Sequence, residues 1–142
     1  MRKLLLLPLL LLPILALAQN DSGDADAKVL SAEVLWQLDR IGSPAISPSG
    51  EWVVAPVTDY DIEEDKGETR LWLFAADGSV ERPLTVEGQS ASSPMFSPEG
   101  DRLAFVASRG DDDAGQIYLM HMDGPGEAQR LGRIPTGAGG LK

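Results

Sequence analysis

One short segment occurs twice in this chain, and its recurrence limits the possible folds more than any other feature. The sequence ISPSGEWVVA at residues 46–55 returns as FSPEGDRLAF at residues 96–105. In both copies a polar loop, a second apolar run ending in Asp-Gly and a short segment with a basic residue before Leu follow in the same order. An internal repeat with a period of nearly fifty residues is typical of architectures built from stacked units.

Each copy contains two sequences that are typical of tight turns. In Ser-Pro-x-Gly, Pro fixes φ at about −65° and Gly supplies a positive φ without steric cost. Asp-Gly is suited in the same way to a turn between antiparallel strands. The residues expected in these turns are Ser47, Pro48, Gly50, Asp77 and Gly78 in the first copy and Ser97, Pro98, Gly100, Asp123 and Gly124 in the second. The sequence therefore predicts four antiparallel strands in each copy.

The second run of each copy is apolar at every position: LWLFA (71–75) and IYLM (117–120). A strand with one wet face alternates between apolar and polar residues, so these strands are expected to be covered on both faces. Stacked four-stranded units provide such cover. The prediction is an all-β incomplete β-propeller, with one blade over residues 43–92 and a second over residues 93–140. A β-sandwich is the alternative, but it does not require successive units to repeat in sequence.

One short helix is predicted before the repeats, over residues 31–42. Ser31 can cap its N-terminus, and the spacing of Val34, Leu38 and Ile41 places them on one face. Gly42 can end the helix in a left-handed conformation. A single amphipathic helix at this place is expected to pack as a strap onto the β region.

The first eighteen residues have the pattern of a cleaved secretory signal peptide. A basic start precedes an apolar run over residues 4–15 and an A-x-A site, which predicts cleavage between Ala18 and Gln19. The apolar run is shorter than the roughly 20 residues that span a bilayer, which argues against a membrane anchor. We expect an acidic, flexible linker over residues 19–30 and a protein that is secreted or periplasmic.

Composition narrows the possible functions. The formal net charge of −10 over 142 residues should repel nucleic acid and anionic membrane surfaces, so neither is an expected partner after signal cleavage. The absence of Cys excludes disulfides, thiol catalysis and Cys-bound zinc. The chain has no phosphate-cradle motif of the G-x-G-x-x-G kind, and we expect no cofactor.

The repeated segments and QIYLMHMDG (116–124) resemble the WD-like propeller repeat. This repeat occurs in the periplasmic translocation protein TolB and in the N-terminal propeller of prolyl oligopeptidase-family serine peptidases. Residues 30–78 resemble the opening of the acylaminoacyl-peptidase and dipeptidyl-aminopeptidase branch of that family. There a short helix leads directly into the first turn, and the loop of the first blade is often similar to DYDIEEDK (59–66). The resemblance covers about residues 30–142.

The resemblance implies a parent peptidase that cleaves short peptides, in which a propeller precedes an α/β-hydrolase domain. Such a domain carries a Ser nucleophile in G-x-S-x-G, followed by Asp and His. The chain contains no G-x-S-x-G, so no catalytic residue can be transferred to it. Its implied role is to gate access to the catalytic domain. The segment RIPTGAGGLK (133–142) resembles the lead-in to a third blade, so the expected partners are further blades, the hydrolase domain and the peptide substrate.

Two other possibilities stay open. The first is a non-enzymatic, TolB-like periplasmic propeller that binds protein partners. The second is a free-standing protein of two blades, whose exposed strand edges would have to be covered by other copies of the chain.

Two acidic loops and several single residues are candidate sites. The loop at residues 59–68 could hold a cation or the amino terminus of a substrate, but its spacing matches no calcium loop, and a solvated loop is the simpler expectation. GDDDAG (110–115) also lacks that spacing, so no metal site is predicted. His121 could be a ligand or a proton shuttle, although a structural role is more common for a lone His on a strand. Four aromatic residues could stack on a ligand, with core packing as the simpler expectation: Trp36, Trp52, Trp72 and Tyr118.

Overall fold

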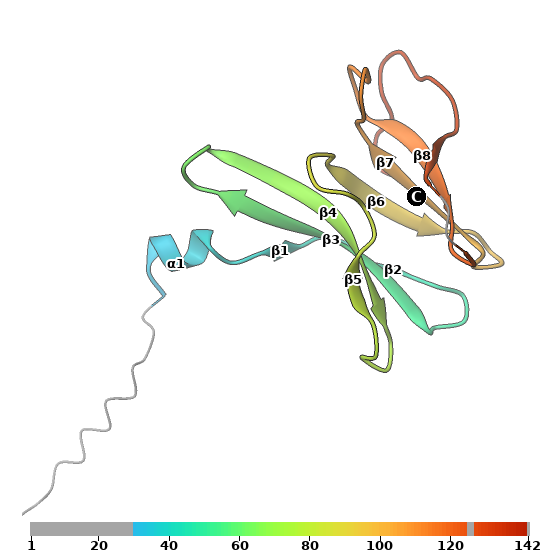
Figure 1. Ribbon diagram of the computed structural model, residues 1–142, viewed down its shortest axis with the longest axis horizontal. Coiled ribbons are helices and arrows are strands. Elements are labelled where there is room, and N and C mark those ends of the chain that lie inside the picture. The colour runs from blue at the N-terminus through green and yellow to red at the C-terminus, as the bar shows by residue number, and fades with distance from the viewer. Residues whose placement is uncertain (1–29, 125–126, 142) are drawn as a thin grey trace, which may run out of the picture.

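The computed structural model describes residues 30–124 and 127–141, which form one short helix and two antiparallel sheets (Figure 1). The predicted signal peptide and its cleavage site at Ala18 and Gln19 lie outside the described residues. The first sheet and the helix before it comprise α1 (Ala32–Trp36), β1 (Arg40–Ile41), β2 (Ala45–Ile46), β3 (Trp52–Asp61), β4 (Lys66–Ala75) and β5 (Glu81–Pro83). The second sheet comprises β6 (Ala91–Phe96), β7 (Arg102–Ala107), β8 (Gln116–His121) and β9 (Gln129–Arg130).

Each sheet is an antiparallel meander in chain order. In the second sheet the order is β6-β7-β8-β9. The first sheet has the same order, except that its first strand is in two pieces, β1 and β2, which both pair with β3. The predicted all-β class, with two consecutive blades of an incomplete propeller, is confirmed.

The repeat in sequence is also a repeat in pairing register. In the second sheet Ser92 pairs with Val106 whereas Met95 pairs with Ala104, so β6 contains one extra residue. The first sheet has the same shift between β1 and β2. A proline lies within each bulge, where its missing N–H removes no hydrogen bond from a regular ladder.

The core lies between the two sheets, where β6 packs against β2, β3 and β4. Its largest fully buried side chains are Phe105, Leu71, Leu103 and Val54. Along β4, Leu71 and Leu73 are buried whereas Trp72 and Phe74 on the opposite face are only half-buried. Within the described residues, each blade is therefore covered on the face that meets the other blade.

The helix is shorter than predicted and is not a buried strap. α1 ends at Trp36, and Arg40 and Ile41 form β1 instead of a further helical turn. Pairing with β3 keeps these two residues extended, so the helical spacing of the sequence is overruled by contacts with a distant strand. No residue of α1 is buried, and in the described part of the chain no helix is long and apolar enough to cross a membrane.

Gly42 allows two strands to approach closely and does not end a helix. Its amide donates a 2.7 Å hydrogen bond to the carbonyl of Pro56. A Cβ atom at this position would lie 2.9 Å from Cγ of Pro56, so a larger residue would push the strands apart.

The Ser-Pro-x-Gly turns have the same geometry in both blades. Gly50 and Gly100 have φ of 73° and 78°, and each amide donates a 2.9 Å hydrogen bond to the carbonyl of the turn's serine. Gly78 has a φ of 77° as well. Gly124 does not adopt a positive φ, so the second Asp-Gly differs from the predicted turn geometry.

Candidate functional site

The β3–β4 hairpin of the first blade is longer than β7–β8, its counterpart in the second. β3 and β4 pair at ten consecutive positions, whereas β7 and β8 pair at six. At about 3.3 Å per residue, the additional pairs lengthen the hairpin by about 13 Å. The end of the hairpin lies beside α1 (Figure 1).

Three side chains form a stacked group where α1 meets the hairpin. The rings of Trp36 and Tyr60 meet edge to face, with centroids 5.7 Å apart and an interplanar angle of 73°. The guanidinium carbon of Arg40 lies 4.7 Å from the Tyr60 centroid and 5.2 Å from the Trp36 centroid. Such cation–π contacts contribute about 0.5–1 kcal/mol at exposed sites. Trp36 is still 47% exposed, so its ring is held in place without being covered.

A pocket of about 210 Å³ lies beside this group. It is lined by Trp36, Tyr60, Asp61, Ile62, Asp65, Lys66 and Gly67. A Cβ atom on Gly67 would come within 2.9 Å of Cε1 of Tyr60, so a glycine here lets the ring lie across β4. The walls of this pocket are thus formed by aromatic and aliphatic side chains, and the carboxylates of Asp61 and Asp65 lie at its edge near the end of the hairpin.

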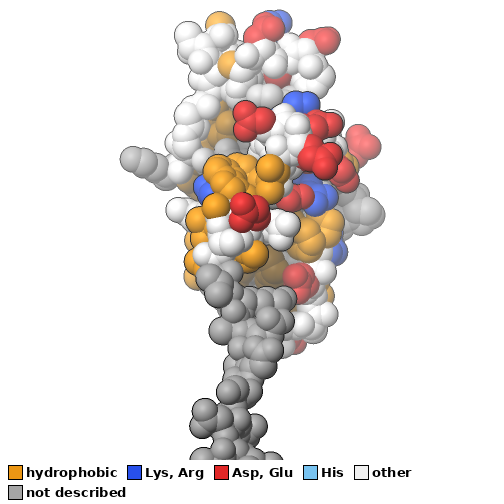
Figure 2. Space-filling model, turned by 90° about the vertical axis from the view of Figure 1, so that its left-hand side faces the viewer, with side chains coloured by type: hydrophobic (Ala, Val, Ile, Leu, Met, Phe, Trp, Pro, Cys, Tyr) orange, Lys and Arg blue, Asp and Glu red, His pale blue; other side chains and the backbone are white. Residues whose placement is uncertain are grey.

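Carboxylates surround the apolar part of this end of the molecule (Figure 2). The side chain of Asp61 accepts hydrogen bonds from the amides of Glu63 (2.8 Å) and Glu64 (3.0 Å), which holds the turn in place. Glu64 pairs with Lys66 at 2.9 Å. Within the described residues, Glu63 and Asp65 make no ion pair.

We name this region the hairpin-end surface and define it by its members. They are Trp36, Arg40, Tyr60, Ile62 and the carboxylates at positions 61 and 63–65. The acidic loop expected from the sequence therefore lies next to the aromatic rings of Trp36 and Tyr60. The sequence alone did not indicate that these groups are neighbours.

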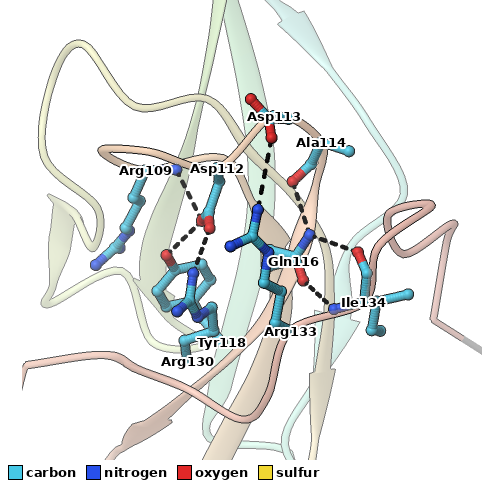
Figure 3. Close-up of polar contacts among 9 residues, drawn as sticks. All are labelled: Arg109, Asp112, Asp113, Ala114, Gln116, Tyr118, Arg130, Arg133 and Ile134. Atoms are coloured by element: carbon cyan, nitrogen blue, oxygen red, sulfur yellow. Dashed lines mark hydrogen bonds and ion pairs between the residues drawn. The ribbon is translucent and has the colours of Figure 1, made fainter.

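A second group of polar residues lies in the second blade, around Asp112 (Figure 3). The Tyr118 hydroxyl donates a 2.7 Å hydrogen bond to the Asp112 carboxylate, the amide of Arg109 donates another at 3.2 Å, and Arg130 forms an ion pair with it. The Asp112 side chain is 2% exposed, unlike those of Asp111 and Asp113 in the same loop. The Tyr118 hydrogen bond holds the pKa of Asp112 below its usual value, and burial raises the pKa of Tyr118.

Gln116 holds the chain after β9 against the start of β8 (Figure 3). Its amide nitrogen donates to the carbonyls of Ala114 and Ile134, and its oxygen accepts a 2.7 Å hydrogen bond from the amide of Ile134. The sequence offered the GDDDAG loop and Tyr118 only as separate candidates, and it gave no reason to connect them or to select Gln116. One feature of the sequence could have indicated this group. Tyr118 lies in the strand that directly follows the GDDDAG loop, close enough for its hydroxyl to reach a carboxylate of that loop.

A pocket of about 380 Å³ lies between the blades, and two of its lining residues each have a buried polar atom without a hydrogen-bond partner among the described residues. They are Nε of Arg109 and Oε1 of Gln89. The Arg109 guanidinium stacks over Tyr118 and Phe105, at 4.7 and 5.6 Å from the ring centroids. It points away from Asp112 (Figure 3).

The remaining predicted residues lie apart from these groups. The turn residues from Ser47 to Gly50 and from Ser97 to Gly100 close hairpins. His121 is exposed at the end of β8, with Nδ1 3.9 Å from a carboxylate oxygen of Asp123, so it is not a packed structural residue. Of the four aromatic residues, Tyr118 is in the core, Trp52 packs against it, Trp72 is half-buried and Trp36 is exposed, so core packing is the wrong expectation for Trp36.

The chemistry of these groups is that of binding and packing. Over residues 30–124 and 127–141 no group of three or more acidic or His side chains is arranged to hold a metal ion. Asp112 already accepts hydrogen bonds from Tyr118 and Arg109 and pairs with Arg130. The hairpin-end surface, in contrast, presents to solvent an exposed aromatic ring, a pocket and two carboxylates, Glu63 and Asp65, that form no ion pair with another described residue.

Comparison with known proteins relates the blades to two groups. The chain is 30% identical over 136 residues to dipeptidyl-peptidase 5 of Porphyromonas endodontalis, which covers 92% of this chain and 19% of that protein. It is 28% identical over 110 residues to the uncharacterized peptidase YuxL of Bacillus subtilis, covering 78% of this chain and 16% of that protein. It is 40% identical over 94 residues to the Tol-Pal system protein TolB of Anaeromyxobacter dehalogenans, covering 66% of this chain and 19% of that protein.

Two solved structures are similar to the chain. The putative TolB from Agrobacterium tumefaciens has a TM-score of 0.47 and 28% identity, over 65% of this chain and 33% of that chain. TolB from Acinetobacter baumannii has a TM-score of 0.49 and 22% identity, over 66% of this chain and 21% of that chain. No protein-family model matches. The chain spans about a fifth or less of the length of the curated relatives, and its two sheets are TolB-like β-propeller blades related in sequence to peptidases.

Proposed function

We propose that these two blades begin the propeller of an exported serine peptidase of the prolyl oligopeptidase family that cleaves short peptides. The propeller gates access of peptides to an α/β-hydrolase domain elsewhere in the longer protein. In that arrangement the blades exclude folded substrates and help to hold the peptide, and the hydrolase domain supplies the nucleophile, the base and the oxyanion site.

The extent of the similarity is the observation that carries this proposal. The alignment with dipeptidyl-peptidase 5 takes in 92% of the chain, so it includes residues before β1 as well as both sheets. The alignment with TolB has 94 residues, which is close to the length of the two blades alone. Blade repeats recur in proteins of unrelated function, so similarity within the blades does not distinguish a peptidase from TolB. Similarity that extends to residues before the blades therefore favours the peptidase over TolB.

The structure of the blades is compatible with a supporting role. The described residues offer binding surfaces and a packed interface between blades, and their buried carboxylate is occupied by structural partners. A propeller that gates a catalytic domain needs shape and rigidity, which the continuous core between the two sheets supplies.

The test is to express the whole reading frame that encodes this chain, including any sequence after Lys142, in its native host. The secreted product is then treated with a fluorophosphonate probe for active serines and assayed on a panel of dipeptidyl methylcoumarylamides. We expect a product longer than this chain that is labelled and releases the fluorophore. An exported product that is neither labelled nor active would contradict the proposal.

A TolB-like, non-enzymatic propeller is the second candidate, favoured by the 40% identity over 94 residues. It predicts a longer product that is exported and unlabelled, and that co-purifies with envelope proteins after cross-linking. The same labelling experiment therefore distinguishes the two candidates.

A further inference from the structure

We propose that the hairpin-end surface is a docking site for a partner protein that presents Lys or Arg side chains around an exposed apolar side chain. The inference concerns the first blade alone, and it holds whether the longer protein is a peptidase or a TolB-like scaffold.

The apolar part of the surface has no cover in the described chain. Trp36 and Ile62 are 47% and 55% exposed. Leu35, which precedes Trp36 on α1 and is outside the defined surface, is 46% exposed, and α1 has no buried residue. A five-residue helix gains little from its own hydrogen bonds, and most helical stability in proteins comes from packing of an apolar face. An apolar helix held at the end of a protruding hairpin therefore has room for a further contact that residues 30–124 and 127–141 do not make.

Trp36 has the properties of a binding anchor. The Tyr60 edge and the Arg40 guanidinium hold its ring in place, and the pocket of about 210 Å³ opens beside it. Tryptophans that are pre-positioned next to a pocket contribute most strongly to binding energy in protein interfaces, because little conformational freedom is lost on docking.

The charge around the anchor selects the partner. The loop over residues 59–68 contains six carboxylates and one lysine, and Lys66 is already paired with Glu64. Glu63 and Asp65 have no ion pair within the described residues, and both lie in the turn beside the pocket. Lys and Arg are the complementary side chains: their aliphatic stems can lie on the Trp36 ring while their charged ends reach these carboxylates.

The same charge disfavours the other occupants. A second copy of this chain, with its net charge of −10, would bring like charges together at this surface. An anionic membrane would be repelled for the same reason, in spite of the exposed Trp beside a short helix. A basic protein partner is the occupant for which both the apolar and the charged parts are favourable.

The first test uses the full chain and a fluorescein-labelled peptide, Lys-Lys-Leu-Phe-Lys-Lys, as a minimal probe of this chemistry. Binding is followed by fluorescence anisotropy at low salt, with a peptide of Glu in place of Lys as the control. A version with benzoylphenylalanine in place of Phe is photocrosslinked and the attached residues are mapped by mass spectrometry. We expect binding of the Lys peptide only, and crosslinks to α1 and to the β3–β4 turn.

Two variants of the surface and two matched controls test the assignment. Trp36→Ala is expected to raise Kd about tenfold, the usual loss for an interface anchor. Ile46→Ala, at an exposed apolar position elsewhere in the first blade, is the control. Glu63→Gln with Asp65→Asn is expected to raise Kd about fivefold, as for exposed ion pairs that act together. As the control for this charge variant, Glu99→Gln with Asp111→Asn removes the same charge from exposed loops of the second blade.

Three results would overturn the proposal. They are equal Kd values for the surface variants and their controls, crosslinks to the second blade, and binding of the Glu peptide.

Circular dichroism identifies any variant that has lost its fold. The variant Glu63→Gln with Asp65→Asn changes only exposed side chains. Its Kd therefore tests whether the peptide binds at the hairpin-end surface even if Trp36→Ala unfolds α1.

Discussion

The hydroxyl of Tyr118 donates a 2.7 Å hydrogen bond to Asp112, the one carboxylate of the GDDDAG loop that points into the protein. The two residues are six positions apart, one in a loop and one in β8. Their contact fixes the β7–β8 loop to the sheet and places the Arg130 guanidinium, on β9, against the same carboxylate. A loop that looks solvated in the sequence is therefore part of the second blade's internal structure.

Replacement of Tyr118 by Phe should lower the free energy of unfolding at pH 7, because the hydrogen bond to the Asp112 carboxylate is lost while the ring packing is kept. Urea denaturation followed by circular dichroism measures this difference.

The same variant should change the response to acid. The hydrogen bond from Tyr118 lowers the folded-state pKa of Asp112, so the stability it contributes is complete above the unfolded-state pKa of about 3.9 and is lost as pH falls through the folded-state value. The difference in stability between wild type and Tyr118→Phe should therefore shrink below about pH 4. A difference that stays constant from pH 7 to pH 2 would show that the hydroxyl does not act through the Asp112 carboxylate.

Phe105→Ala should destabilise the protein by about 3–5 kcal/mol, since Phe105 is fully buried between the sheets and its removal leaves a cavity. Because the core is shared, both sheets should unfold at a lower urea concentration together. Val86→Ala, at an exposed position, should change stability by less than about 0.5 kcal/mol. Two separate transitions in the Phe105 variant would indicate that the blades are independent.

The two Ser-Pro-x-Gly turns should respond differently to the same change. Gly50→Ala should cost about 1–2 kcal/mol because its φ of 73° is unfavourable for a side chain, with open space around the position. Gly100→Ala should cost more, since its Cβ would also lie 3.2 Å from Cδ of Pro48. Thermal unfolding ranks the two variants, and Gly139→Ala, in open space without a positive φ, is the control. A higher stability for Gly100→Ala than for Gly50→Ala would contradict the observed contact between the two turns.

Gly67→Ala should displace the Tyr60 ring from Trp36, because the added methyl group would lie 2.9 Å from Cε1 of Tyr60. The expected result is a loss of near-ultraviolet circular dichroism from the aromatic residues, with unchanged far-ultraviolet signal. It should also weaken binding of the Lys peptide, since the Trp36 anchor is no longer held. A near-ultraviolet spectrum identical to that of the wild type would show that the ring accommodates the methyl group.

Much of the fold follows from local patterns. The Ser-Pro-x-Gly turns, the apolar runs and their recurrence specify the order of the strands, because turn geometry and strand alternation depend on neighbouring residues. The bulge in the first strand of each blade coincides with a proline in both copies, which is the kind of feature that sequence alone can indicate.

The helix and the sites depend on contacts between distant residues. The spacing of Leu38 and Ile41 fits a helix. Ile41 is nevertheless in a strand, because it pairs with Val57 of β3, a residue that is distant in the sequence. Trp36 and Tyr60 are far apart in sequence, and only the length of the β3–β4 hairpin brings them together. The same holds for Asp112 and Arg130.

The sequence by itself thus determined the blade repeat, its turns and its acidic character, all of which are local or additive properties. The tertiary structure decided which carboxylate is buried, which aromatic ring stays exposed and where a pocket forms. Burial is a property of the surroundings. Asp111, Asp112 and Asp113 are chemically the same residue, and the positions of Tyr118 and Arg130 on the neighbouring strands are what cover the side chain of Asp112.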